Sequence, residues 1–205
     1  KALEKRGIRF RTGCDVRGTG SDGDGISLEL GNTATGHTEW VHADVVMLAV
    51  GVTANVQDLG LEALGVDLKD GHIDVDENGE TNIPGLFAIG DVAGAPWLAH
   101  KASHEGVRCA EYIAGQEPRR VVSPVPACTY SDPQIASVGL TEELAVEVHG
   151  EIRVGRFPFR LNGRALSAGI SEGFVKTIFE ARTGRLVGAH MIGSDVSELI
   201  HSLVL

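Results

Sequence analysis

Asn82-Ile-Pro-Gly-Leu-Phe-Ala-Ile-Gly-Asp91 is followed by Trp97-Leu-Ala-His-Lys-Ala-Ser-His-Glu-Gly106, and these two stretches decide the expected fold. Residues 86–89 are an apolar run of strand length, which predicts a buried strand that ends at a Gly-Asp pair. Small and apolar residues then recur at helical spacing up to Gly115, which predicts a helix over about residues 97–114. A strand, a turn and a helix start in this order are typical of a ligand site at the carboxyl end of a sheet.

The residues at this junction suit an electron-rich ligand with a hydroxylated chain. The carboxylate of Asp91 is placed to accept a hydrogen bond from a sugar or polyol hydroxyl. The predicted helix start offers unpaired backbone N–H groups and the positive end of the helix dipole. Together they fit a flavin, although a turn capped by Asp91 before an ordinary helix has the same spacing. The candidate flavin contacts are Asp91, Trp97, Leu98, Ala99 and His100.

Composition excludes several classes of protein. The 205 residues are 42% hydrophobic and 22% charged, which predicts a globular, soluble chain. A net charge of -10 argues against a nucleic-acid partner, which needs a basic face. No apolar run approaches the roughly 20 residues that span a bilayer, so no membrane partner is expected. Cys14, Cys109 and Cys128 form no close pair, which favours a reducing compartment.

The N-terminal quarter reads as a small antiparallel meander. Apolar and polar side chains alternate in three segments that are separated by Gly, Asp and Asn: residues 8–12, 25–30 and 37–41. This pattern is typical of antiparallel strands with one solvent-exposed face. Residues 43–51 are almost continuously apolar, which predicts a strand buried on both faces of a larger sheet. Asp70-Gly71 predicts a turn between two short extended segments.

The C-terminal half predicts a second sheet. Residues 115–126 are rich in proline and lack a period, which marks a domain boundary. A helix is expected from Thr141, whose Thr-x-Glu-Glu start resembles an N-cap with an acidic first turn, and another from Asp195. Strands are expected near 127–130, 135–139, 152–159, 174–181 and 186–192.

Several motif matches fail on their context. Gly18-Thr-Gly-Ser-Asp-Gly23 has the dinucleotide spacing but precedes a strand, so it predicts a plain loop. Asp74–Gly79 copies half of a calcium loop without the closing Glu, which predicts a turn. Residues 169–173 have nucleophile-elbow spacing but precede a strand. His100 and His104 lack an evident third ligand, so no metal is expected.

The deciding stretch also resembles a known family. Thr81–Asp91 with Leu98–Gly106 resembles the second FAD-binding motif of the flavoprotein pyridine nucleotide-disulfide oxidoreductases. The form Leu98-Ala-His-Lys-Ala102 resembles the branch that oxidises dihydrolipoamide. Essentially all of the chain is covered, because further segments resemble that branch in the same order: Ala43–Gly51, Asn55, Leu59–Gly65, Tyr130–Thr141, Val154–Phe159 and Gly188–Gly193.

The resemblance implies a fold class of α/β and α+β. Parts of two Rossmann-like nucleotide-binding domains with a β-meander would precede an α+β dimerisation domain. Residues 1–52 would be the C-terminal part of the NAD-binding domain and residues 53–121 the second part of the FAD-binding domain. Residues 122–205 would be a truncated dimerisation domain. The implied cofactors are therefore FAD and NAD.

The resemblance also implies residue roles. Asp91 would bond the ribityl chain of FAD, and the backbone of residues 98–100 would meet the pyrimidine end of the flavin. Gly51 and Val16 match positions that line the NAD site, where a glycine lets the nucleotide approach the backbone. At Val52-Thr53 the family more often has two basic residues, so one contact of the relatives is expected to be absent.

The implied activity of the complete protein is oxidation of protein-bound dihydrolipoamide by NAD+ through a redox-active disulfide and a histidine base. This chain has no Cys-x-x-x-x-Cys pair, and none of its 8 histidines precedes a proline. No catalytic residue is therefore assigned within it. Its ends, inside a helix end at Lys1 and in an apolar periodic run at Leu205, predict a C-terminal fragment without dehydrogenase activity of its own.

The implied partners are a second copy of the protein and the lipoyl-bearing acyltransferase of a 2-oxo acid dehydrogenase complex. The implied compartment is the bacterial cytoplasm or the mitochondrial matrix. Two alternatives stay open. One is a related disulfide reductase acting on glutathione or mercuric ion, against which Leu98-Ala99 weighs. The other is a non-catalytic interaction module, which would bind a partner without flavin absorbance.

Overall fold

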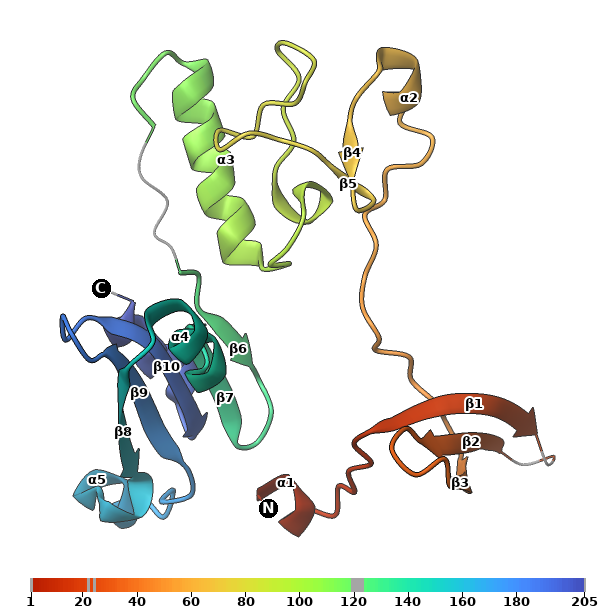
Figure 1. The fold of residues 1–205 in the computed structure, drawn as a ribbon, viewed down its shortest axis with the longest axis vertical. Helices are drawn as coiled ribbons and strands as arrows, with labels where there is room; N and C mark the ends of the chain where they lie inside the picture. The colour runs from red at the N-terminus through yellow and green to blue at the C-terminus, as the bar shows by residue number, and fades with distance from the viewer. Residues whose placement is uncertain (1, 22, 24, 119–123, 205) are drawn as a thin grey trace. The chain divides into compact units, whose positions relative to one another are not determined.

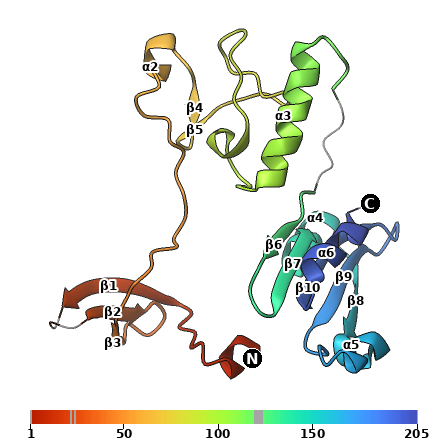
Figure 2. The same ribbon diagram turned by 180° about the vertical axis from the view of Figure 1, so that it is seen from behind.

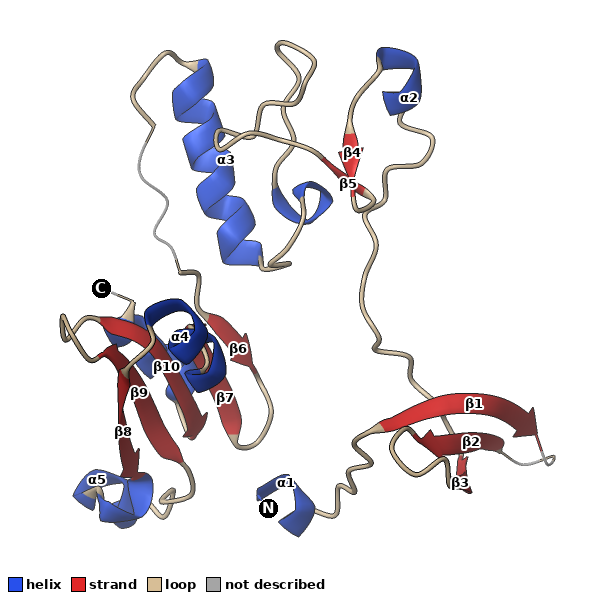
Figure 3. Cartoon of the chain, viewed as in Figure 1, coloured by secondary structure: helices blue, strands red, loops and turns tan. Residues whose placement is uncertain are grey.

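The computed structural model describes residues 2–21, 23, 25–118 and 124–204, and it divides into two compact units (Figure 1). The first unit is Lys1–Val52 and the second is Thr53–Leu205. Figure 3 shows that strands dominate the first unit, whereas the second unit contains both helices and sheets.

The first unit is a short helix and an antiparallel sheet. Helix α1 is Ala2–Lys5, and strands β1 (Cys14–Ser21), β2 (Ile26–Asn32) and β3 (Thr38–Ala43) pair in the order β1-β2-β3. The predicted strands near 25–30 and 37–41 are thus confirmed as β2 and β3. Strand pairing sets Gly18 opposite Glu29 and Glu29 opposite Trp40.

Three predictions for this unit are wrong. Residues 8–12 form no strand, and the third strand is β1, which takes in the first part of the Gly18–Gly23 segment predicted as a loop.

The indole of Trp40 explains why strand β1 tolerates its glycines. A Cβ added at Gly20 would lie 3.8 Å from the Trp40 ring, so the indole packs over the glycine-containing strand and supplies the apolar contact that the glycines lack.

The buried strand predicted over residues 43–51 is also not formed. Strand β3 ends at Ala43, and the side chains of Val45, Met47, Leu48 and Val50 are 81% to 92% exposed. A strand covered on both faces needs neighbouring strands and a covering layer. Within the described residues no strand pairs with this segment, so its apolar side chains stay in water.

The second unit begins with four short elements and one long helix, of which η1 packs on the helix. They are α2 (Leu61–Leu64), β4 (Leu68–Lys69), β5 (His72–Ile73), the 3-10 turn η1 (Gly90–Ala93) and α3 (Ala99–Ile113). The Asp70-Gly71 turn is confirmed between β4 and β5, with φ of 49° and 78° at its two residues. A small core holds the segment together, formed by Val66, Ile73 and Ala88 with flanking apolar side chains.

The helix predicted over about 97–114 is confirmed as α3, whereas the strand predicted at residues 86–89 is wrong. In place of a strand, this segment is extended and makes one isolated bridge, between Phe87 and Glu80. Its side chains do pack, since Ala88 is buried and Phe87 meets Tyr112 of α3 edge to face at 6.1 Å. The apolar run therefore correctly predicted that this segment packs in the interior, but its prediction of a strand paired within a sheet was wrong.

The rest of the second unit is a five-stranded antiparallel sheet in the order β6-β7-β10-β9-β8. Helix α4 lies over one face in Figure 1, and α6 lies over the other face in the reverse view of Figure 2. The strands are β6 (Ala127–Thr129), β7 (Gln134–Gly139), β8 (Ile152–Pro158), β9 (Phe174–Glu180) and β10 (Leu186–Gly193). The helices and 3-10 turns are α4 (Glu142–His149), η2 (Phe159–Leu161), α5 (Gly163–Ser167), α6 (Val196–Leu199) and η3 (Ile200–Leu203).

All five predicted strands of this half are confirmed, together with the helix at Thr141. The Thr141 hydroxyl oxygen accepts a hydrogen bond from the Leu144 N–H at 3.3 Å, as an N-cap should. The core lies between the sheet and α6, with Ala136, Val138, Ala189, Met191, Val196 and Ile200 buried. Residues 119–123 of the proline-rich boundary lie outside the described residues. No helix in the described part of the chain combines the length and apolarity needed to cross a membrane.

Candidate functional site

The Gly90–Ala93 turn and the start of α3 form the candidate site. Gly90 has φ +76°, a left-handed conformation that glycine adopts without strain, and a Cβ there would lie 3.2 Å from the Ala102 Cβ. A glycine is therefore needed where η1 approaches α3. Asp91 is the first acidic residue of η1, and its side chain is exposed.

The predicted flavin contacts all lie around this junction. Leu98 is the extended N-cap of α3, and its carbonyl accepts the first helical bond from Ala102 N–H at 3.1 Å. Ala99 and His100 are the first two residues of the helix and are exposed. Because the first N–H groups of a helix have no partner within it, this end offers donors and a positive dipole beside η1, which packs on α3.

A clamp of two charged side chains fixes η1 on α3. Lys101 is buried, and its Nζ donates to the carbonyl oxygen of Gly94 at 2.8 Å and pairs with Glu105 Oε1 at 3.0 Å. The other carboxylate oxygen, Glu105 Oε2, accepts the backbone N–H of Gly90 at 2.8 Å. Both ends of the turn that carries Asp91 are thus tied to the first two turns of the helix.

Sequence reasoning missed these two residues. Lys101 and Glu105 lie within the motif, but the sequence pattern assigns no role to either. Their spacing of four residues is the pattern of a helical ion pair and was a usable signal. The backbone groups that they bind, on Gly90 and Gly94, follow only from the folded loop.

Two more side chains at the helix start have defined partners. The indole Nε1 of Trp97 donates to Nε2 of His72 at 3.3 Å, and the two rings stack with centroids 5.9 Å apart. Nε2 of His100 lies 2.8 Å from the carbonyl oxygen of Pro126, so this nitrogen carries a proton. In the described residues no cluster of three or more His, Cys, Asp or Glu is arranged to hold a metal ion.

The two predicted NAD contacts lie in the first unit. Val16 is in β1 next to a break in the strand register, and its side chain is 58% exposed. Gly51 follows the exposed apolar segment, has φ +140° and has open space where a Cβ would stand. Both positions are accessible, and they lie in different segments of this unit.

The cysteines are free thiols in three different elements. Cys109 is buried in α3, and burial raises its thiol pKa, with a smaller contribution from the charge of Asp76. Burial also raises the pKa of Cys128 in β6, with Glu198 adding to the effect. The prediction that Cys109 is a small buried apolar side chain is confirmed, and neither thiol is activated as a nucleophile.

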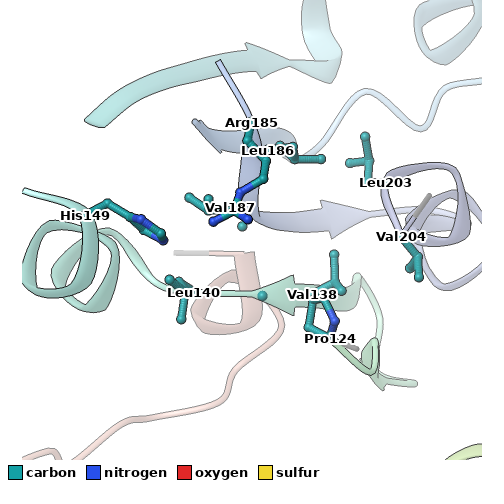
Figure 4. Close-up of a pocket in the computed structure, with 11 residues that line it drawn as sticks. Pro124, Val138, Leu140, His149, Arg185, Leu186, Val187, Leu203 and Val204 are labelled. Carbon is teal, nitrogen blue, oxygen red and sulfur yellow. The ribbon is translucent and has the colours of Figure 1, made fainter. Parts of the chain in front are cut away.

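A cavity in the five-stranded sheet lies away from Asp91. It has a volume of about 470 Å³ and opens between β7, β10, the end of α4 and η3 (Figure 4). Its walls are mostly apolar, with Val138, Leu140, Leu186 and Leu203 among them, and His149 and Arg185 are its basic side chains. It belongs to the five-stranded sheet and not to the candidate site.

Curated relatives match the whole chain. Dihydrolipoyl dehydrogenase of Rhizobium etli is 48% identical over 100% of this chain, and that of Zymomonas mobilis is 46% identical over 98%. The mitochondrial dihydrolipoyl dehydrogenase of Pisum sativum is 42% identical over 98% of the chain. The chain spans 43%, 43% and 40% of the length of these three proteins.

Solved structures give the same fold. The crystal structure of LpdA from Mycobacterium tuberculosis superposes with a TM-score of 0.81 at 28% identity, over 98% of this chain and 43% of that one. A HOCl-induced flavoprotein disulfide reductase, RclA from Escherichia coli, superposes with a TM-score of 0.85 at 22% identity, which supports the fold alone.

Two family models together cover nearly all of the chain. Residues 125–205 match the dimerisation domain of the pyridine nucleotide-disulphide oxidoreductases. Residues 1–106 match the model named pyridine nucleotide-disulphide oxidoreductase. The expected fold class, α/β nucleotide-binding parts followed by an α+β dimerisation domain, is thereby confirmed. From the matched motifs, the relatives and the shared fold, the chain belongs to the pyridine nucleotide-disulphide oxidoreductase family.

Proposed function

We propose that this chain is part of a dihydrolipoamide dehydrogenase, an enzyme that uses FAD to reoxidise protein-bound dihydrolipoamide with NAD+. The observation that carries the proposal is the junction of η1 and α3, where an exposed carboxylate stands beside a helix start. Identities of 42% to 48% to proteins named dihydrolipoyl dehydrogenase support this branch of the family over a glutathione or mercuric reductase.

The residues at the junction fit a flavin. Asp91 is exposed, so its carboxylate is free to accept from a ribityl hydroxyl. A Cβ at Gly90 would press on α3, so the glycine keeps the turn close to the helix that supplies the N–H donors. When bound, FAD would supply the two-electron carrier between the thiols and NAD+. The chain's own part is to bind it and to stabilise negative charge near the helix start.

The remaining site residues take supporting roles in this proposal. Ala99 and His100 would present their backbone N–H groups to the flavin ring. The Leu98 N–H already donates to the Pro96 carbonyl oxygen at 3.0 Å, so Leu98 and Trp97 would contact the flavin through other atoms. Val16 and Gly51 would contact NAD, and the open backbone at Gly51 suits close approach of a nucleotide. No residue of this chain is assigned to bond breaking, because the buried Cys109 and the partly buried Cys128 have raised thiol pKa values.

The domain roles follow from the same proposal. Residues 1–52 would close the NAD-binding domain, residues 53–121 would complete the FAD-binding domain, and residues 122–205 would form the dimer face. The match of residues 125–205 to a dimerisation domain supports a homodimer. We further propose docking to the lipoyl-bearing acyltransferase of a 2-oxo acid dehydrogenase complex, in a bacterial cytoplasm or a mitochondrial matrix. Bacterial and mitochondrial relatives support both compartments.

Flavin retention by the complete protein tests the proposal. Asp91→Ala should weaken FAD binding by about 1.5 to 3 kcal/mol, the value of a hydrogen bond to a charged group, whereas Asp91→Asn keeps an acceptor and should lose less. The measurement is the ratio of flavin to protein absorbance after dilution and gel filtration. Unchanged retention in the alanine variant would remove Asp91 from the site. A complete protein that purifies without flavin and does not reduce NAD+ with dihydrolipoamide would refute the function.

A further inference from the structure

We propose that His72 is a positioning residue of the flavin site, acting through Trp97. The inference rests on the proposed function, because it concerns the same junction. His72 lies on β5. It precedes Trp97 by 25 positions in the sequence and lies outside the motif that marks the site. Its imidazole contacts two groups at once, and together they allow only one protonation state.

The two contacts fix the tautomer of the ring. Nδ1 of His72 lies 3.0 Å from the carbonyl oxygen of Asp70, and a carbonyl only accepts, so Nδ1 carries the proton. Nε2 lies 3.3 Å from the indole Nε1 of Trp97, and an indole N–H only donates, so Nε2 keeps its lone pair. Only the neutral ring with hydrogen on Nδ1 satisfies both partners.

The surroundings make the ring a link between the two halves of the site. Asp70 and Gly71, both with positive φ, form the tight turn that returns β5 against β4 and brings the Asp70 carbonyl to the ring. Strand β5 also packs against η1, the turn that carries Asp91. The two rings lie 23° from parallel, with their centroids 5.9 Å apart. His72 therefore joins the Asp91 turn to the residue just before the helix start.

Loss of the acceptor at position 72 would release this link. The Trp97 N–H would then lose its partner, and an indole that is 41% exposed has room to turn toward water. We expect flavin affinity to fall in that case, because Trp97 directly precedes Leu98, the N-cap of α3.

The test uses the complete protein carrying Trp40→Phe, so that Trp97 is the one tryptophan left in this chain. Further substitutions in this background separate the contacts of His72 from those of Trp97. His72→Phe keeps a stacking ring and removes both hydrogen bonds, whereas His72→Gln keeps an acceptor. Trp97→Phe removes the donor. One neutral hydrogen bond corresponds to a factor of about 2 to 12 in affinity. We expect the FAD dissociation constant to rise by such a factor for His72→Phe and for Trp97→Phe, with no further rise in the double variant.

Tryptophan emission gives a readout that does not need the flavin. In the flavin-free protein the emission of Trp97 should change in His72→Phe, because the indole N–H loses its acceptor, and His104→Phe, which replaces an exposed histidine on α3, should leave the emission unchanged. His72→Gln should bind FAD more tightly than His72→Phe. Additive losses in the double variant, or unchanged affinity and emission in His72→Phe, would overturn the proposal. A Trp40→Phe parent that binds no FAD would instead refute the proposed function, and the role of His72 with it.

Discussion

Replacing Lys101 by methionine should release the turn that carries Asp91. The variant keeps the apolar stem of the side chain and removes two interactions, the charged hydrogen bond to Gly94 and the pair with Glu105. A hydrogen bond to a charged group contributes about 1.5 to 3 kcal/mol. Breaking a fully buried ion pair costs about 3 to 5 kcal/mol, and exposed helical pairs only about 0.3 to 0.5 kcal/mol.

The burial of the clamp decides between these limits. The side chain of Lys101 is 10% exposed and that of Glu105 is 27% exposed, so water screens the carboxylate in part. We therefore expect a loss of about 2 to 3 kcal/mol in the free energy that holds η1 on α3. If Asp91 needs this turn to bind the ribityl chain, the FAD dissociation constant of the complete protein should rise about 30- to 150-fold.

Titration of the flavin-free protein with FAD, followed by flavin fluorescence, measures this constant. Glu105→Gln is the matched partner variant, since it loses the charge but keeps an acceptor for the Gly90 N–H, and its effect should be about half as large in free energy. Arg182→Met serves as the control, because the side chain of Arg182 is 85% exposed and its ion pair should contribute little. Equal FAD affinity in Lys101→Met and the parent, or strictly additive losses in the double variant with Glu105→Gln, would refute the clamp.

Two further predictions concern the thiols and the acid stability. Burial raises the thiol pKa of Cys109, and the charge of Asp76 raises it further. This thiol should therefore react with a thiol reagent only when the protein unfolds, which mass spectrometry of the labelled peptide would show. Fast labelling of the native protein would contradict this prediction. Glu142 accepts from Lys176 and then from Arg156, which lowers its carboxyl pKa, so the stabilisation that it provides is present at neutral pH and is lost as pH falls below about 4.5. Glu142→Gln should therefore lower the urea midpoint at pH 7 and have a smaller effect at pH 4, and an equal effect at both pH values would rule out an ionic contribution.

The elements that the sequence predicted well are those whose partners lie near them in the chain. Strands β8, β9 and β10 follow one another in the sequence and include adjacent antiparallel pairs, so alternation and turn residues were enough. The apolar segments 43–51 and 86–89 were predicted as buried strands and are not strands. Hydropathy records the tendency of a segment to leave water, and pairing depends on whether another strand is available to it.

The same distinction separates the parts of the candidate site. Asp91 and the start of α3 could be predicted because a local motif places them within ten residues of each other. The sequence assigns no role to Lys101, and only the folded loop shows the Gly94 carbonyl oxygen that binds its buried ammonium group.

His72 is the clearest case of a residue that local reasoning could not reach. The Asp70-Gly71 turn before it was predicted from turn chemistry alone, and that turn is what brings the Asp70 carbonyl to Nδ1. The other nitrogen is satisfied by an indole that follows 25 positions later. A histidine whose two nitrogens are both committed has a single tautomer, and a single tautomer defines where its neighbour's N–H must lie. The Asp70-Gly71 turn, which the sequence shows only as a chain reversal, therefore also sets the position of the His72 ring in the folded site.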